Sequence, residues 1–165
     1  MSKTIEDLKA AFAGEAQANR RYTSFAKKAE DEDYPQIAKL FRAIAAAEAV
    51  HAANHLKALG ELLGTADNLG AAMQGEHHEV VSMYPPFIQA AEEEGSKRAL
   101  TSFRWAWEVE KIHEQLYHQA SGSLGSEPSG EEYYVCPICG YTHTGLPPEK
   151  CPVCGTPGIR FELIN

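Results

Sequence analysis

Two copies of a Glu-x-x-His motif, 62 residues apart, place the strongest constraint on how this chain folds. The first copy runs from Glu48 to His51 and the second from Glu110 to His113, each inside a long stretch with helical character. Residues three apart lie on the same face of a helix, so each copy presents a carboxylate and an imidazole to one point. Two such motifs, joined by one Glu from each of two further helices, are typical of four-helix bundles that bind two metal ions.

The same spacing relates many positions outside the motifs, so residues 1–119 contain an internal repeat. Tyr22 corresponds to Tyr84, for example. Two helical hairpins related by duplication predict a four-helix bundle with approximate two-fold symmetry, in which equivalent residues face each other across the core. Other matched pairs are Phe25 and Phe87, Ala29 and Ala91, Glu30 and Glu92, Phe41 and Phe103, and Arg42 and Arg104.

Residues that cap or interrupt helices divide this region into four expected helices. Pro85 and Pro86 follow Tyr84, and proline disrupts a helix because it has no backbone N–H, so we expect a bend just after Tyr84 in the third helix. The other ends are expected at a Thr4 to Asp7 capping box, at Pro35 in the first turn of the second helix, at Gly60 and Gly64 where it stops, at Asn68 as the cap of the third helix, and at Gly95-Ser96 before the fourth.

Glutamates occupy the apolar face of every expected helix. A buried carboxylate without compensation is costly, and like charges at short range add to that cost. Two divalent cations would compensate these charges, with the neutral imidazoles of His51 and His113 completing the coordination. Oxygen and imidazole ligands suit iron or manganese, and zinc also fits by affinity. The five carboxylates are Glu15, Glu48, Glu76, Glu79 and Glu110.

All cysteines of the chain lie near its C-terminus, in two C-x-x-C pairs. Each pair has Pro after its first Cys and Gly after its second, as in the turns that direct backbone N–H groups at metal-bound sulfur. Two disulfides are the alternative, but paired C-x-x-C turns favour a single tetrahedral metal site. Zinc would make the site structural, and iron would make it an electron-transfer centre. The four ligands would be Cys136, Cys139, Cys151 and Cys154.

Composition suggests where the chain divides and what it does not bind. Residues 120–130 are rich in Gly, Ser and Pro and predict a flexible linker between a helical domain, residues 1–119, and a small module, residues 131–165. The net charge of −8 argues against binding to nucleic acid. Neither an apolar run of about 18 residues nor a signal peptide is recognisable, so we expect a cytoplasmic protein with no membrane partner.

These motifs together resemble the rubrerythrins, over nearly the whole chain. Rubrerythrins join a ferritin-like diiron bundle to a rubredoxin-like domain, so the resemblance implies a mostly α fold with a small C-terminal metal-binding β module. The stretches that carry it are Gly14-Glu15 to Arg21-Tyr22, Phe41-Arg42 to His51, Gly75 to Glu79 with Met83 to Pro85, Glu110 to His113, and Cys136 to Tyr141 with Cys151 to Cys154.

The resemblance also implies the cofactors and the roles of individual residues. Two non-haem iron ions would lie in the bundle, and one iron ion would be bound by the four cysteines. Glu79 matches a carboxylate that exchanges with the imidazole matching His51 when one iron changes oxidation state. Tyr22 and Tyr84 match tyrosines that are hydrogen-bonded near the carboxylates. The implied bundle ligands are Glu15, Glu48, His51, Glu76, Glu79, Glu110 and His113.

By resemblance, we expect a diiron peroxidase that reduces hydrogen peroxide to water in oxidative stress defence. Electrons would come from a rubredoxin or an NAD(P)H-dependent rubredoxin reductase and pass through the cysteine-bound iron. We further expect a homodimer or higher homo-oligomer, in which the C-terminal module approaches the bundle of its partner. The alternatives are ferritin-like iron oxidation and storage, and a metal-binding protein with a structural zinc ribbon.

Overall fold

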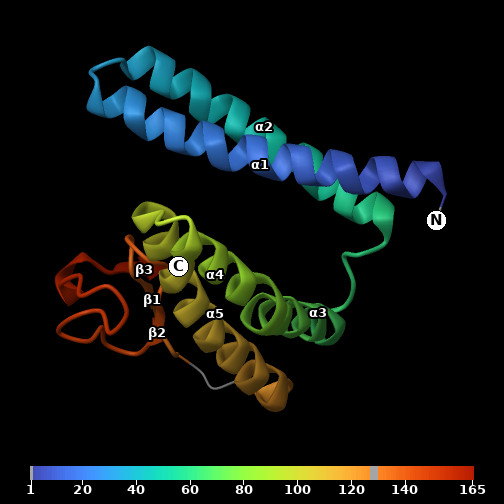
Figure 1. The fold of residues 1–165 in the computed structure, drawn as a ribbon. Helices are drawn as coiled ribbons and strands as arrows, with labels where there is room; N and C mark the ends of the chain where they lie inside the picture. The colour runs from blue at the N-terminus through green and yellow to red at the C-terminus, as the bar shows by residue number, and fades with distance from the viewer. Residues whose placement is uncertain (1, 127–129) are drawn as a thin grey trace. The chain divides into compact units, whose positions relative to one another are not determined.

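The computed structural model describes residues 2–126 and 130–165. It divides into two compact units, one ending at Leu63 and the other beginning at Gly64. Figure 1 gives the order of helices and strands along the chain. No helix among the described residues is long and apolar enough to cross a membrane. The domain limits expected from the sequence, 1–119, 120–130 and 131–165, stay a prediction.

The first unit is a helical hairpin of α1 (Lys3–Asp31) and α2 (Pro35–Leu59) (Figure 1). Pro35 occupies the first turn of α2, and Gly60 ends it with a left-handed φ of 73°, as predicted. The expected cap at Thr4 is wrong, because α1 begins earlier and the Ser2 hydroxyl accepts a hydrogen bond from the Ile5 N–H.

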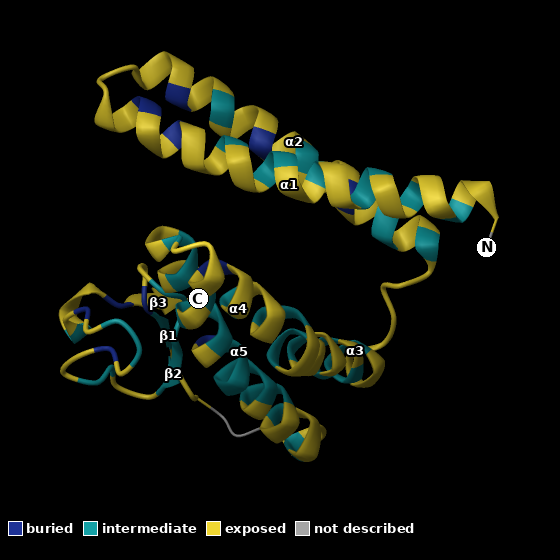
Figure 2. Cartoon of the chain, in the orientation of Figure 1, coloured by how far each residue is buried: buried dark blue, intermediate teal, exposed yellow. Residues whose placement is uncertain are grey.

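Small side chains line the contact between α1 and α2. In Figure 2 the buried positions of this hairpin lie where the two helices face each other. Alanine at these positions lets the two backbones approach closely, and it costs little side-chain entropy on burial. The buried residues are Ala26, Ala29, Ala38, Ala45 and Ala52.

The helices of the second unit are α3 (Thr65–His78), α4 (Tyr84–Glu93) and α5 (Lys97–Ser123), with a π-helical turn, η1 (Glu79–Met83), joining α3 to α4. Gly95 and Ser96 separate α4 from α5, as predicted. The expected cap at Asn68 is wrong, because α3 begins after Gly64 and the Asn68 N–H already bonds to the Gly64 carbonyl, 2.9 Å away.

The third helix and the end of α5 differ from the sequence expectations. The bend expected just after Tyr84 is not where the helix is irregular: the wide turn of η1 lies before Tyr84, and α4 runs through Pro85 and Pro86. Helix α5 continues through Ser123, into the segment 120–130 that the sequence suggested as a linker. Residues 127–129 of that segment lie outside the described residues.

In the second unit, α3 and α4 pack against α5 to form a second hairpin, and the internal repeat is visible in the contacts of both hairpins. Tyr22, Phe25 and Phe41 form an aromatic cluster with ring centroids 5.6 to 6.3 Å apart. Their counterparts Tyr84, Phe87 and Phe103 form a second cluster at 5.7 to 6.4 Å. An ion pair accompanies each cluster: Arg42 with Glu30, and Arg104 with Glu92. Duplicated residues therefore make duplicated contacts.

The C-terminal module is a three-stranded antiparallel sheet of order β2-β1-β3, from β1 (Tyr133–Val135), β2 (Thr142–Thr144) and β3 (Glu162–Ile164). A 3-10 turn, Gly158–Arg160, precedes β3. Cys136, Cys151 and Phe161 form its buried core, against which Tyr134 and Tyr141 pack. Strand β2 contacts α5 of the same unit, which brings the module beside the second Glu-x-x-His motif.

Candidate metal centres

The first Glu-x-x-His motif gathers three ligand groups within the first hairpin. Ligand atoms of Glu15, Glu48 and His51 all lie within 4.8 Å of one another. The His51 Nδ1 atom is 2.8 Å from a Glu48 carboxylate oxygen and 3.9 Å from one of Glu15. Helices α1 and α2 therefore bring together one carboxylate from α1 and a carboxylate and imidazole from α2.

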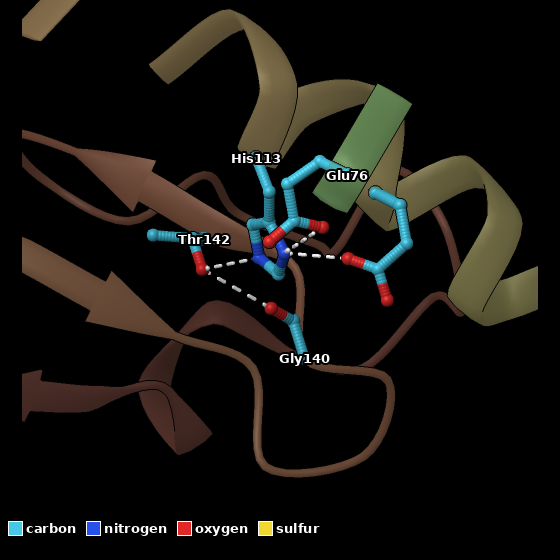
Figure 3. Close-up of polar contacts among 5 residues, drawn as sticks. Glu76, His113, Gly140 and Thr142 are labelled. Atoms are coloured by element: carbon cyan, nitrogen blue, oxygen red, sulfur yellow. Dashed lines mark hydrogen bonds and ion pairs between the residues drawn. The ribbon is translucent and has the colours of Figure 1, made fainter. Parts of the chain in front are cut away.

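The second motif gathers the equivalent set within the second unit (Figure 3). Ligand atoms of Glu76, Glu110 and His113 also lie within 4.8 Å of one another. The His113 Nδ1 atom is 2.7 Å from Glu110 and 3.9 Å from Glu76, distances that nearly repeat those of the first set. The chain thus carries two matching sets of two carboxylates and one imidazole.

The imidazoles of His51 and His113 differ in the hydrogen bonding of Nε2, the ring nitrogen that faces away from the carboxylates. The His113 Nε2 atom lies 3.0 Å from the Thr142 hydroxyl, which in turn donates to the Gly140 carbonyl at 3.2 Å (Figure 3). Because the hydroxyl uses its one proton on Gly140, it accepts from His113, so Nε2 carries a proton. Neutral His113 then has its lone pair on Nδ1, which faces the carboxylates and is ready to bind a metal.

His51 has no comparable anchor within the described residues of the first hairpin, where its contacts are those of Nδ1 with Glu48 and Glu15. Its side chain is 55% exposed, against 27% for His113. His51 is consequently the imidazole with more freedom to turn.

Glu79 lies beside the second set without joining the mutually close group of three. Burial raises the pKa of its carboxyl, and the charge of Glu110 raises it further. Burial, followed by the charges of Glu79, Glu110 and Glu76, raises the pKa of the Tyr84 phenol, so its hydroxyl keeps its proton. Tyr22 lies in the aromatic cluster of the first hairpin. The carboxylate hydrogen bonds expected for Tyr22 and Tyr84 stay a prediction.

The close approach of Glu76 and Glu110 shifts the pKa values of the two carboxyls in opposite directions. Burial, the hydrogen bond with Glu110 and the charge of Glu110 raise the pKa of Glu76 to about 7. Burial alone would also raise the pKa of Glu110, but hydrogen bonds with His113 and Glu76 lower it. The hydrogen bond with Glu110 raises the pKa of His113. A bound cation would take the place of these protons, so the donor set fits a divalent metal.

We predict that the metal affinity of this set falls as the pH is lowered from 8 to 6. Glu76, with a pKa of about 7, and protonated His113 hold protons at low pH that a metal must displace. Each displaced proton reduces the affinity by about tenfold per pH unit in the range where its group is protonated. Anaerobic titration of the iron-free protein with Fe²⁺ measures the change, and an affinity independent of pH would contradict the assignment.

The four cysteine sulfurs form one compact group in the C-terminal module, with all Sγ atoms within 4.8 Å of one another. The Sγ atoms of Cys136 and Cys154 are 3.6 Å apart, and those of Cys139 and Cys151 are 3.5 Å apart. These separations exceed the disulfide bond length of about 2.05 Å. They are near the sulfur-to-sulfur edge of about 3.8 Å in a tetrahedron whose metal–sulfur bonds are about 2.3 Å.

The turns around the sulfurs explain this arrangement. Gly140 and Gly155 adopt left-handed φ values of 83° and 78°, and their N–H groups bond to the Cys136 and Cys151 carbonyls. Burial raises the pKa of Cys139. Burial also acts to raise the pKa of Cys154, but hydrogen bonds with the side chain and backbone of Thr156 outweigh it and lower the pKa to about 7. The group fits a metal that binds four thiolates.

Comparison with known proteins decides what this combination of sites belongs to. The sequence model of the rubrerythrin domain matches residues 6–121. The chain belongs to the rubrerythrin family. A second match, to the rubrerythrin rubredoxin-like domain, covers residues 134–162.

Individual relatives are similar in sequence to this rubrerythrin over nearly all of the chain. It is 38% identical to nigerythrin of Nitratidesulfovibrio vulgaris, over 98% of this chain and 86% of that protein. It is 39% identical to a rubrerythrin of Porphyromonas gingivalis, over 99% of this chain and 91% of that protein. A solved structure of nigerythrin in a mixed-valence state has a TM-score of 0.60 at 38% identity, covering 99% of this chain and 88% of that one.

These matches confirm the expected fold class, a ferritin-like helical bundle followed by a rubredoxin-like β module. They also confirm the expected cofactors, a non-haem diiron pair in the bundle and a single iron ion in the rubredoxin-like module. As a rubrerythrin, the protein is an oxidoreductase of oxidative stress defence. Which residues bind each ion stays a prediction.

Sequence reasoning missed the roles of two residues around these sites, Thr142 and Trp107. Thr142 carries no motif, and its contact with His113 depends on how the C-terminal module packs on α5, which local patterns do not reveal. Trp107 belongs to no motif, yet its indole N–H donates to the carbonyl of Val80 at 2.8 Å, and Val80 directly follows Glu79 in the sequence.

Proposed function

We propose that this rubrerythrin is a peroxidase that reduces hydrogen peroxide to two water molecules with two electrons and two protons. The observation that carries the proposal is the hydrogen-bonded path from Gly140, which follows Cys139, through Thr142 to His113. Storage of iron does not require a thiolate centre joined to the ligand set in this way. A thiolate centre linked to a diiron ligand by hydrogen bonds suits repeated peroxide reduction, because it could return electrons to the iron pair after each turnover.

The proposed ligands of the diiron pair are Glu15, Glu48, His51, Glu76, Glu79, Glu110 and His113, and those of the single iron ion are Cys136, Cys139, Cys151 and Cys154. The mutually close sets in the two hairpins support this assignment for all but Glu79. When bound, the iron pair supplies the two electrons that cleave the O–O bond, and the thiolate iron returns electrons one at a time.

The side chains have distinct proposed roles in this reaction. His113 holds its Nδ1 lone pair toward the site because Thr142 fixes the proton on Nε2. His51, which lacks such an anchor among the described residues of its hairpin, is the imidazole proposed to exchange with Glu79. A carboxyl oxygen of Glu79 passes protons from solvent to the departing oxygen. The hydroxyls of Tyr84 and Tyr22 are proposed to orient the carboxylates by hydrogen bonding.

The remaining parts of the proposal concern partners. A rubredoxin or an NAD(P)H-dependent rubredoxin reductase would donate electrons to the thiolate iron in the cytoplasm. We propose a homodimer or higher homo-oligomer, as the resemblance to the rubrerythrins implies. The contact of β2 with α5 lies within one unit of one chain, so it also supports electron transfer from the module to the ligand set of its own chain.

The proposal predicts prompt reoxidation of both iron centres when the anaerobically reduced protein receives hydrogen peroxide. One peroxide should accept two electrons, so about one equivalent oxidises the diiron pair and half an equivalent more oxidises the single iron. Stopped-flow absorbance, following the ferric thiolate bands and the diferric bands separately, measures both. A reduced protein that does not react within minutes would reject the peroxidase function.

The Thr142→Val variant tests the path itself. Removing the hydroxyl leaves the His113 Nε2 proton without an acceptor, and changes of this kind typically cost about tenfold to a hundredfold in activity or metal affinity. We expect slower reoxidation of the thiolate iron by about tenfold. Thr144→Val, in the same strand, is the matched control and should react at the rate of the unaltered protein. Equal rates in both variants would remove the support that Thr142 gives.

A further inference from the structure

The π-helical turn η1 leaves one backbone carbonyl without its usual helical partner. The Tyr84 N–H donates to the carbonyl of Glu79, five residues earlier, whereas in an α-helix it would donate to Val80. The next residue, Pro85, has no N–H to offer. The Val80 carbonyl therefore needs a donor from outside its own helix, because half-buried carbonyls without hydrogen bonds are unfavourable.

Trp107 of α5 provides that donor. Its indole N–H lies 2.8 Å from the Val80 carbonyl oxygen. The indole is itself held in place, since the Lys111 ammonium lies 3.2 Å from its ring centroid and 2.9 Å from the carboxylate of Glu108. A fixed side chain on the neighbouring helix thus bonds to the carbonyl that the wide turn exposes.

The first hairpin is an internal comparison for this turn. Glu15 and Glu76 are 61 residues apart, but Tyr22 and Tyr84 are 62 apart, so the second hairpin holds one additional residue between glutamate and tyrosine. The corresponding part of α1 is continuous α-helix. The position equivalent to Trp107 in the repeat is Ala45, whose own carbonyl accepts from the Asn19 side chain at 2.7 Å. The wide turn and the tryptophan occur together.

We propose that Trp107 is a positioning residue for Glu79: its indole N–H satisfies the Val80 carbonyl and so fixes the π turn that sets the direction of the Glu79 side chain. The turn begins at Glu79, whose backbone carbonyl is the acceptor of its characteristic bond. If the turn relaxed to an α-helix, Glu79 would rotate relative to Tyr84 and α4. The proposal rests on the proposed function in that it assigns Glu79 to the diiron site.

Trp107→Phe tests this inference, because it keeps an aromatic ring and removes the N–H. Two measurements apply: hydrogen exchange of the Tyr84 amide in the iron-free protein, and anaerobic Fe²⁺ titration. We expect exchange to speed up by at least tenfold and Fe²⁺ affinity to fall by about tenfold. Trp105→Phe is the matched control and should leave both unchanged. Benzothienylalanine at position 107 has the shape of tryptophan without the N–H and should act like Phe.

The outcomes separate this inference from the proposed function. Normal Tyr84 exchange and normal Fe²⁺ affinity in Trp107→Phe would overturn the inference, as would an equal loss in Trp105→Phe. If phenylalanine at 107 prevents folding, the benzothienylalanine protein decides by the same two measurements. If unaltered protein fails to reduce peroxide while Trp107→Phe still loosens Tyr84 and weakens Fe²⁺ binding, the peroxidase function fails and the role of Trp107 stands.

Discussion

Cys139→Ser is expected to abolish peroxide reduction sustained by an external electron donor, lowering the turnover rate by at least about a hundredfold. Cys139 lies 3.5 Å from Cys151 in the sulfur cluster, and the Gly140 carbonyl that follows it begins the path to His113. A serine hydroxyl is a poorer ligand than thiolate for iron, since soft sulfur ligands select such centres. Steady-state turnover with a reduced rubredoxin as donor measures the effect.

The same variant separates electron supply from peroxide chemistry. After chemical reduction, its diiron pair should still react with one equivalent of peroxide at nearly the normal rate, because the substitution leaves the helical ligand sets intact. Ile138→Ser changes the exposed neighbouring side chain and keeps four thiolates, so it should retain donor-dependent turnover. Full turnover in Cys139→Ser would mean that electrons reach the diiron pair by another route.

Local patterns predicted the parts of the structure that depend on residues close in sequence. Glu48 and His51 meet because they are three apart on one helix, and the same holds for Glu110 and His113. The repeat matched the residues of the two hairpins one to one, and the structure places the matched residues in equivalent aromatic clusters and Arg–Glu ion pairs. These contacts follow from helix geometry and from duplication, both of which the sequence displays.

Contacts between distant residues could not be predicted in this way. The hydrogen bond between His113 and Thr142 requires the sheet of the C-terminal module to pack on α5, and the intervening chain gives no indication of its direction. The wide turn at Glu79 did have a signal, the change of repeat spacing from 61 to 62 residues between Glu15 and Tyr22. The bend predicted from Pro85 and Pro86 was placed after Tyr84, whereas the wide turn lies before it. A proline removes hydrogen bonds from the turn that precedes it, so its effect falls earlier in the chain.

The N-cap of α1 is a further feature that the sequence pattern did not predict correctly. Ser2 and Thr4 are both good N-cap residues, and the sequence pattern favoured Thr4 because Asp7 follows it in a capping-box arrangement. In the structure Ser2 caps α1, and its backbone carbonyl also accepts from the Ile5 and Glu6 N–H groups. Starting the helix earlier adds intrahelical hydrogen bonds at little cost, which decides between two caps of similar strength.

Glu110→Ala is expected to remove Fe²⁺ binding at the second ligand set and to lower peroxidase activity by at least about a hundredfold. Glu110 lies 2.7 Å from the His113 Nδ1 atom and is hydrogen-bonded to Glu76, so it contacts both other members of the set. Without it, the second set keeps two ligands, Glu76 and His113, which are too few to hold a second cation. Iron analysis after anaerobic loading should fall from two bundle ions toward one.

Stability measurements give this variant a second, independent outcome. Fe²⁺ at a hundred times its dissociation constant stabilises a folded protein by about 2.7 kcal/mol per site, provided that the unfolded chain does not bind it. The rise in melting temperature on adding Fe²⁺ should therefore be smaller in Glu110→Ala. Glu92→Ala, which removes an exposed carboxylate paired with Arg104, is the matched control and should keep the full rise, because exposed ion pairs contribute little. An equal rise in both variants would place the second iron away from Glu110 and would require a different ligand set in α3 and α5.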